Sequence, residues 1–276
     1  MNAMPPAPTR TASTENFPVG SRLIAPALRP VVMAYYRVAR AADDIADDPA
    51  LAADEKTRLL ERIDATLAGT SDQDPAAMAL RGIFRSQGLA IEHARHLLQA
   101  FQADAINRPC RSWSDLLAYC RFSAAPVGRF LLELHGEARS TWPAGDALCS
   151  ALQILNHLQD CQADWRGLQR LYIPSDWLRE AALTPDVLLV ADTSPALRGV
   201  LNRVLDGVDR LNQVAVTLPR QVANRRLRME VAAILFISHR LAARLRRQDP
   251  LAGRVALSAI EKVGALLVGV TRGWWR

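Results

Sequence analysis

The sequence lacks the long apolar runs that a membrane-spanning helix requires. Its longest uncharged apolar stretches, such as residues 231–237 and 265–270, are far shorter than the roughly 20 residues needed to cross a bilayer. This excludes an integral membrane protein with spanning helices. Strand-like alternation and runs of β-branched or aromatic residues are also scarce, which argues against a β-sheet.

Closely spaced cysteines are missing as well. The four cysteines, at positions 110, 120, 149 and 161, form no CxxC pair. Zinc modules and secreted disulfide frameworks show such spacings, so we expect neither and predict a reducing compartment. Residues 1–14 are rich in Pro, Ala and Thr and lack the apolar centre of a secretory signal. We predict a flexible tail over 1–14 and one domain over 15–276.

The sequence has helical periodicity almost throughout, with prolines between the periodic stretches. We see no internal repeat and no long linker, so the predicted fold is a single all-α domain. A Ser112–Asp115 capping pair predicts that one long helix, which must accommodate Pro126, follows it. The predicted helices cover residues 30–47, 53–67, 75–86, 91–106, 112–137, 145–165, 175–181, 195–218, 219–248 and 250–270.

Charge is distributed unevenly over a net value of +6. From residue 195 onward there are 15 basic and five acidic side chains, whereas the first 194 residues carry a net charge of −4. This asymmetry predicts an anionic partner for the second half and cations for the first. An anionic membrane surface fits the basic half, and residues 266–276 contain the Trp and Arg typical of an interfacial segment.

Acidic residues line one face of the first predicted helix. At about 100° per residue, Tyr36, Arg40, Asp43 and Asp47 lie on a common face. The neighbouring Asp44 and Asp48 lie to the side, where we expect them to be supporting or solvated. A similar face recurs in the helix predicted over 145–165, where its members are Gln153, Asn156, Asp160 and Asp164.

Each of these faces contains an Asp-x-x-x-Asp pair, here written DxxxD. Like charges four residues apart destabilise a helix by a few tenths of a kcal/mol, and Asp is a poor helix former. Mg²⁺ compensates for both effects, because it takes oxygen ligands and bridges carboxylates to phosphates. We predict that Asp43, Asp47, Asp160 and Asp164 hold two or three Mg²⁺ ions around one diphosphate. The alternative is that both pairs are solvated helix ends.

A diphosphate held in this way is a leaving group, and its departure leaves a carbocation. Arginines suit the diphosphate because their donors are bidentate, and the candidates are Arg40, Arg170 and Arg254. A carbocation requires a dry cavity with aromatic faces. Tyr36 and Tyr119 are candidate cation stabilisers, although core packing explains either of them equally well.

Three segments resemble the squalene and phytoene synthases, the head-to-head prenyl synthases. They are YYRVARAADDIAD at 35–47, YCRFSAAPVGRFLLELHGE at 119–137 and LQILNHLQDCQADWRGLQRLYIP at 152–174. The resemblance extends over about residues 15–255. The segments TENFPV, RAADDIADD and NHLQDCQAD are most similar to one branch of that family, the hydroxysqualene synthases of bacterial hopanoid biosynthesis.

This resemblance implies an isoprenoid-synthase-like bundle around a central cavity and an isoprenoid diphosphate substrate. For the branch, it implies Mg²⁺-dependent ionisation of presqualene diphosphate and capture of the rearranged cation by water. It assigns the metal to the four aspartates, and the cavity and diphosphate to Tyr36, Arg40, Gln153, Asn156, Arg170, Tyr172 and Arg254. It also implies a bacterial protein of the cytoplasm or the inner membrane face, with substrate handed over by a presqualene diphosphate synthase. Gln159 departs from the pattern, because relatives usually carry an Arg there.

Several alternatives stay open. A presqualene diphosphate synthase, a squalene synthase or a phytoene synthase would use the same metal cage to condense two prenyl diphosphates. A reductive squalene synthase needs a nicotinamide cofactor; we expect none, although the missing GxGxxG is weak evidence. A di-iron bundle is excluded because no Glu has His three residues later. A non-enzymatic basic protein that binds membranes or nucleic acid would leave the aspartate pairs unexplained, so we expect no nucleic-acid partner.

Overall fold

The computed structural model describes residues 24–274, apart from the side chains of residues 262, 266 and 272–274. The predicted tail over 1–14, Trp275 and Arg276 lie outside the described residues. Between 24 and 274 the chain forms helices and no strand, which confirms the all-α prediction. Contacts divide the chain into two compact units, one ending at Arg108 and the other beginning at Pro109. The single domain and its central cavity stay predictions.

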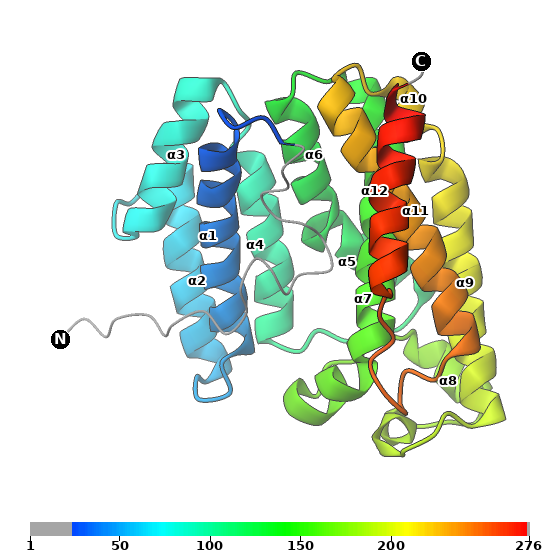
Figure 1. Cartoon of the computed structure of the whole chain (residues 1–276). Helices are drawn as coiled ribbons and strands as arrows, with labels where there is room; N and C mark the ends of the chain where they lie inside the picture. Colours follow the sequence, from blue (N-terminus) through cyan, green and yellow to red (C-terminus); the bar gives the residue numbers. More distant parts are fainter. Residues whose placement is uncertain (1–23, 275–276) are drawn as a thin grey trace. The chain divides into compact units, whose positions relative to one another are not determined.

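The described part of unit 1, residues 24–108, contains four helices, which appear in blue to cyan in Figure 1. α1 packs against α3 and α4, and α2 packs against the same two helices. The core between them includes Tyr35, Leu60, Ile63 and Phe84, each at most 4% exposed. The helices are α1 (Arg29–Asp47), α2 (Ala53–Ala68), α3 (Pro75–Gln87) and α4 (Glu92–Ala105).

Unit 2 is built around one long helix, α7 (Trp142–Leu168), which carries the second aspartate pair. It contacts α5 (Trp113–Ser123), α6 (Ala125–Leu134), α9 (Pro195–Ala215) and α11 (Arg225–Arg247). α12 (Ala259–Trp274), red in Figure 1, packs along α11. The short elements are η1 (Arg139–Thr141), α8 (Ser175–Glu180), η2 (Pro185–Leu189) and α10 (Leu218–Gln221).

The predicted helix over 112–137 is wrong, because the structure divides it into α5 and α6. Ser112 and Asp115 do form the predicted capping box at the start of α5. Pro126, however, lies in the first turn of α6, where its missing N–H costs no hydrogen bond. In a continuous helix, Pro126 would have removed one backbone hydrogen bond, and its ring would have clashed with the preceding turn.

The two last predicted helices also begin later than expected. α11 begins after Asn224, whose side chain accepts a hydrogen bond from the Leu227 amide at 3.1 Å. α12 begins after Ser258, which exchanges capping bonds with Glu261. The residues between α11 and α12 therefore form a non-helical loop, and Arg254 lies in it.

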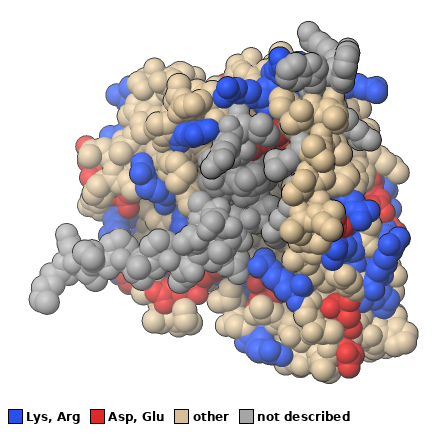
Figure 2. Space-filling model, viewed as in Figure 1, with Lys and Arg blue, Asp and Glu red and all other residues tan. Residues whose placement is uncertain are grey.

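The basic half of the chain is partly neutralised by ion pairs. Arg246 of α11 contacts Asp206 and Asp209 of α9 at 2.8 and 2.6 Å. Arg240 and Arg244 both contact Glu261. The face seen in Figure 2 accordingly shows acidic side chains among the basic ones. Among the described helices, none is long and apolar enough to cross a membrane.

Candidate active site

α1 carries the first DxxxD pair, and Arg40 contacts it directly. Nη1 of Arg40 donates to Oδ2 of Asp43 at 2.6 Å, and Nη2 donates to Oδ1 of Asp44 at 2.5 Å. The side chains of Arg40 and Asp44 are only 11% and 12% exposed, whereas that of Asp43 is 32% exposed. Asp44 is therefore a supporting partner of the arginine and not a solvated residue.

The Asp43 carboxyl is electrostatically crowded. Its burial raises the pKa to about 7, and the negative charge of Asp47 contributes to the rise. Asp104 of α4 raises the pKa further, whereas the positive charge of Arg40 lowers it. A hard cation bound here would relieve the crowding, because positive charge favours the ionised carboxylate. The donor set therefore fits Mg²⁺.

The two tyrosines at the beginning of this face have different surroundings. The Tyr35 hydroxyl donates to the His93 carbonyl at 3.2 Å, and its ring stacks on Phe84 with centroids 6.1 Å apart. Tyr35 is thus a core residue. Tyr36 is half-buried on the side of α1 that carries Arg40 and Asp43. Its role as a cation stabiliser stays a prediction.

α7 carries the second DxxxD pair, and the structure brings Arg254 to it. Nε of Arg254 lies 3.2 Å from Oδ1 of Asp160. The Asp160 side chain is 19% exposed and that of Arg254 is 49% exposed, so the guanidinium extends toward solvent. A predicted diphosphate-binding arginine therefore contacts a predicted metal aspartate, from a loop distant in sequence.

Three rings cluster beside this pair. The imidazole of His157 stacks on Tyr172, with centroids 3.6 Å apart and planes inclined by 19°. Tyr119 of α5 lies 5.7 Å from His157 and 5.1 Å from Tyr172 between ring centroids. Predicted residues from α5 and from the segment after α7 thus meet around a histidine that the sequence analysis did not select.

His157 is held in its neutral form. Burial, together with the positive charge of Arg170, lowers the pKa of His157 to about 3. Nε2 of Gln153 lies 3.2 Å from Nε2 of His157. The Gln153 amide is therefore within hydrogen-bonding distance of the ring.

The turn after α7 brings Arg170 and Tyr172 back to this region. Gln169 adopts the left-handed conformation with φ of 53°, and the Arg170 amide bonds the Asp164 carbonyl at 3.2 Å. Reversal of the chain at this turn explains why Arg170 affects the His157 pKa and why Tyr172 stacks on that ring. Arg170 is itself buried, at 8% exposed. Gln153, Asn156, Asp160 and Asp164 stay on the one helix, as predicted.

Comparison with known proteins identifies the family of the chain. The family model for squalene/phytoene synthase matches residues 10–261. The chain belongs to the squalene/phytoene synthase family. It is 40% identical to a hydroxysqualene synthase of Sinorhizobium fredii over 90% of this chain and 85% of that protein. A hydroxysqualene synthase of Rhodopseudomonas palustris is also 40% identical, over 92% and 87% of the two chains.

A solved structure supports the same assignment. The crystal structure of a squalene synthase from Alicyclobacillus acidocaldarius is 29% identical in sequence and superposes with a TM-score of 0.73, covering 86% of this chain and 90% of that one. As a member of the squalene/phytoene synthase family, the chain is an enzyme of isoprenoid biosynthesis. Membership favours the enzyme over the non-enzymatic basic protein.

In this family member the two aspartate pairs belong to different units, Asp43 and Asp47 to unit 1 and Asp160 and Asp164 to unit 2. Their convergence on shared ions stays a prediction. Within the described residues no three Asp, Glu, His or Cys side chains form a metal-binding group. Mg²⁺ needs no such group, since it is commonly bound by one or two carboxylates together with waters and phosphate oxygens.

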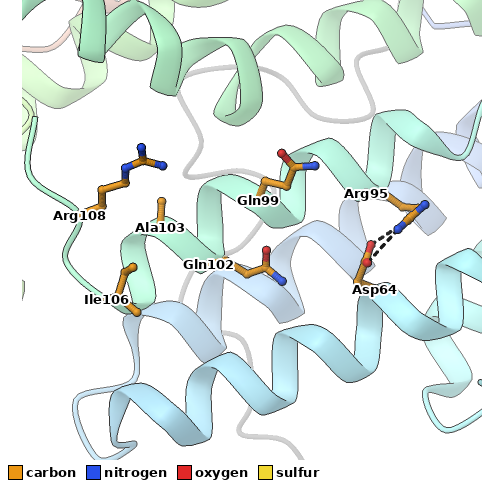
Figure 3. Close-up of a pocket in the computed structure, with 7 residues that line it drawn as sticks. All are labelled: Asp64, Arg95, Gln99, Gln102, Ala103, Ile106 and Arg108. Atoms are coloured by element: carbon orange, nitrogen blue, oxygen red, sulfur yellow. Dashed lines mark hydrogen bonds and ion pairs between the residues drawn. The ribbon is translucent and has the colours of Figure 1, made fainter.

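A surface pocket of about 490 Å³ lies elsewhere in the squalene/phytoene synthase chain (Figure 3). Its Arg95 and Asp64 form an ion pair at 2.8 Å, drawn dashed in Figure 3. No residue predicted for the site lines it. The lining residues are Asp64, Arg95, Gln99, Gln102, Ala103, Ile106 and Arg108.

Sequence analysis missed two residues that lie near the second DxxxD pair. His157 follows Gln153 by four positions and precedes Asp160 by three, so helical spacing could have found it. Gln159 was noted only as a departure from the family pattern. Its buried amide Nε2 donates to the carbonyl of Val255, the neighbour of Arg254, and no sequence signal indicates this contact.

Proposed function

We propose that the chain is a hydroxysqualene synthase-type enzyme that converts presqualene diphosphate and water into hydroxysqualene and diphosphate with Mg²⁺. The observation that carries the proposal is that an arginine contacts one aspartate of each DxxxD pair. Arg40 contacts Asp43, and Arg254 contacts Asp160. Carboxylates beside arginines suit a ligand made of metal ions and phosphate oxygens, because carboxylates bind the ions and guanidinium groups bind the phosphate oxygens.

Two or three Mg²⁺ ions would be held by Asp43, Asp47, Asp160 and Asp164. When bound, they neutralise the charge that develops on the departing diphosphate. The arginines supply the remaining donors: Arg254 is half-exposed and can turn from Asp160 to a phosphate oxygen. Arg40 is more buried than Arg254 and stays in contact with Asp43 and Asp44.

The ring cluster suits the carbocation that remains. Tyr119 and Tyr172 present aromatic faces, which attract a cation through the ring quadrupole. His157, which stacks on Tyr172, carries no charge at neutral pH, because its pKa is about 3. A neutral imidazole does not repel the cation, whereas a protonated one would. Tyr36 and Asn156 contribute to the cavity lining in this proposal.

The reaction balances without a redox cofactor. The bond from carbon to the diphosphate oxygen breaks and its electron pair leaves with the diphosphate. Water then forms a new carbon–oxygen bond with the rearranged cation, and a proton of that water passes to the diphosphate or to solvent. No hydride is consumed, so the proposed reaction needs no nicotinamide.

Separate incubations with presqualene diphosphate and with farnesyl diphosphate test the proposal, with Mg²⁺ and mass analysis of the lipid product. We expect hydroxysqualene from presqualene diphosphate and no product from farnesyl diphosphate. Presqualene diphosphate or phytoene-type products formed by condensation of prenyl diphosphates would instead support the alternative branches. Loss of turnover on chelation, with unchanged circular dichroism, tests the Mg²⁺ requirement.

We also propose peripheral contact with the inner membrane face, where substrate arrives from a presqualene diphosphate synthase. Four apolar residues of α12 spaced three or four positions apart support the contact, because each is 44–84% exposed: Ile260, Val263, Leu267 and Val270. Such a stripe is typical of interfacial helices. Flotation with anionic liposomes tests it, and equal recovery of the wild type and a Val263→Ser, Leu267→Ser variant would count against the contact.

A further inference from the structure

Two neighbouring residues of α7 contact two neighbouring residues of the loop between α11 and α12. Gln159 donates its side-chain amide to the Val255 carbonyl. The next residue along α7, Asp160, contacts the preceding loop residue, Arg254, at 3.2 Å. The two contacts lie side by side and link the same segments of unit 2.

The two contacts differ in exposure. Gln159 and Val255 are 4% and 2% exposed, so their hydrogen bond is shielded from water. Arg254, in contrast, is half-exposed and reaches Asp160 through Nε. A buried bond whose loss leaves an unpaired carbonyl is kept, whereas a solvent-exposed ion pair exchanges partners readily. The Gln159 contact is therefore the fixed one and the Arg254 contact the exchangeable one.

The loop is also fixed at both ends, away from Arg254. Asp249 accepts a hydrogen bond from the Thr193 amide at 2.7 Å and one from the Leu251 amide at 2.9 Å. At the other end, Ser258 and Glu261 form the cap of α12. Between these points, the Gln159 bond fixes the backbone next to Arg254.

We propose that Gln159 is a positioning residue, which holds the Val255 backbone so that Arg254 stays within reach of both Asp160 and the diphosphate. This inference rests on the proposed function. With a cation held at Asp160, Arg254 would be able to leave the carboxylate and donate to a phosphate oxygen without movement of the loop.

Single and double substitutions test this role. Gln159→Met keeps the side-chain length and removes the donor, and Arg254→Ala removes the guanidinium. We expect each to lower kcat for diphosphate release from presqualene diphosphate by roughly ten- to a hundredfold. If Gln159 acts through Arg254, the double variant is no slower than Arg254→Ala. Multiplied effects in the double variant would overturn the proposal.

The same helix offers a matched control. Gln162 donates its side-chain amide to the Val190 carbonyl at 2.9 Å, which is also a bond from a glutamine to a backbone carbonyl, but an exposed one made away from the Arg254 loop. We expect Gln162→Met to keep wild-type kcat. If Gln159→Met does not fold, Gln159→Arg keeps a donor at this position. A kcat within about threefold of wild type then supports the proposal, and a loss equal to that of Arg254→Ala overturns it.

Binding of inorganic diphosphate in the presence of Mg²⁺, measured by calorimetry, separates this inference from the proposed function. We expect the Kd to rise about tenfold in Gln159→Met and to stay unchanged in Gln162→Met. Equal Kd values in the two variants would overturn the role of Gln159. Absence of hydroxysqualene from the wild-type reaction would instead refute the proposed function and leave the binding comparison valid.

Discussion

Nε of Arg254 lies 3.2 Å from Oδ1 of Asp160, although one residue belongs to a loop and the other to the middle of α7. The pair places a positive charge beside a carboxylate that we expect to bind Mg²⁺. The guanidinium is a counter-ion for Asp160. Binding of metal and diphosphate would replace that ion pair with one interaction for each partner, the cation for Asp160 and a phosphate oxygen for Arg254.

The role of Asp160 leads to the first prediction. Asp160→Asn removes the negative charge and keeps the side-chain size, so we expect kcat for diphosphate release to fall on the order of 10²-fold or more. Circular dichroism should stay helical. Asp206→Asn, on an exposed aspartate of α9, is the control and should keep wild-type turnover. Near-wild-type turnover of Asp160→Asn would contradict the metal site.

The second prediction concerns ligand-dependent stability. Mg²⁺ with inorganic diphosphate should raise the melting temperature, because a ligand at 100 times its Kd adds about 2.7 kcal/mol to the free energy of unfolding. Asp43→Asn should lose most of this increase. Asp48→Asn should keep it, since Asp48 only accepts a bond from the Ala50 amide, which Asn can also accept. Equal shifts in both variants, measured by differential scanning fluorimetry, would exclude Asp43 from the site.

The third prediction follows from the low pKa of His157. The folded pKa is about 3 against a reference of 6.5, so the unfolded chain binds more protons between these pH values. The contribution of His157 to the free energy of unfolding should therefore fall as the pH drops below 6.5, by up to about 1.4 kcal/mol per pH unit, whereas the raised pKa of Asp43 contributes in the opposite direction. Urea unfolding at pH 7, 6 and 5 measures it.

His157→Gln should remove this contribution, so the free energy of unfolding of the wild type should fall relative to that of the variant as the pH drops. His239→Gln is the matched control, since His239 is exposed on α11. We expect the control to keep the wild-type slope. The same pH dependence in His157→Gln and in the wild type would mean that His157 makes no such contribution.

The fourth prediction concerns the packing of unit 2. A Cβ added at Gly207 of α9 would overlap the ring of Trp113, which stacks on Trp177 with centroids 5.8 Å apart. Gly207→Ala should lower the free energy of unfolding by about 1–3 kcal/mol. Gly199 of the same helix has no heavy atom within 4 Å of an added Cβ, so Gly199→Ala should stabilise by about 0.5–1 kcal/mol. Urea unfolding distinguishes them, and equal effects would contradict the packing argument.

Helical periodicity predicted most of the elements, because the apolar face of each helix must repeat every three or four residues wherever it packs. α1 and α2 match their predicted ranges within one residue. The errors fall at prolines and caps. Pro126 begins a helix instead of interrupting one, and Asn224 and Ser258 delay α11 and α12. Such ends depend on single side-chain hydrogen bonds, which periodicity does not report.

The sequence by itself determined the helical class, both DxxxD pairs and the family, since these depend on local spacing and on motifs within one helix. Only the tertiary structure decided which distant side chains lie beside the second pair. The partner of Asp160, the rings around His157 and the bond from Gln159 to Val255 all join segments that are remote along the chain. Contacts of this kind arise from packing of helices against loops, and no local pattern encodes them.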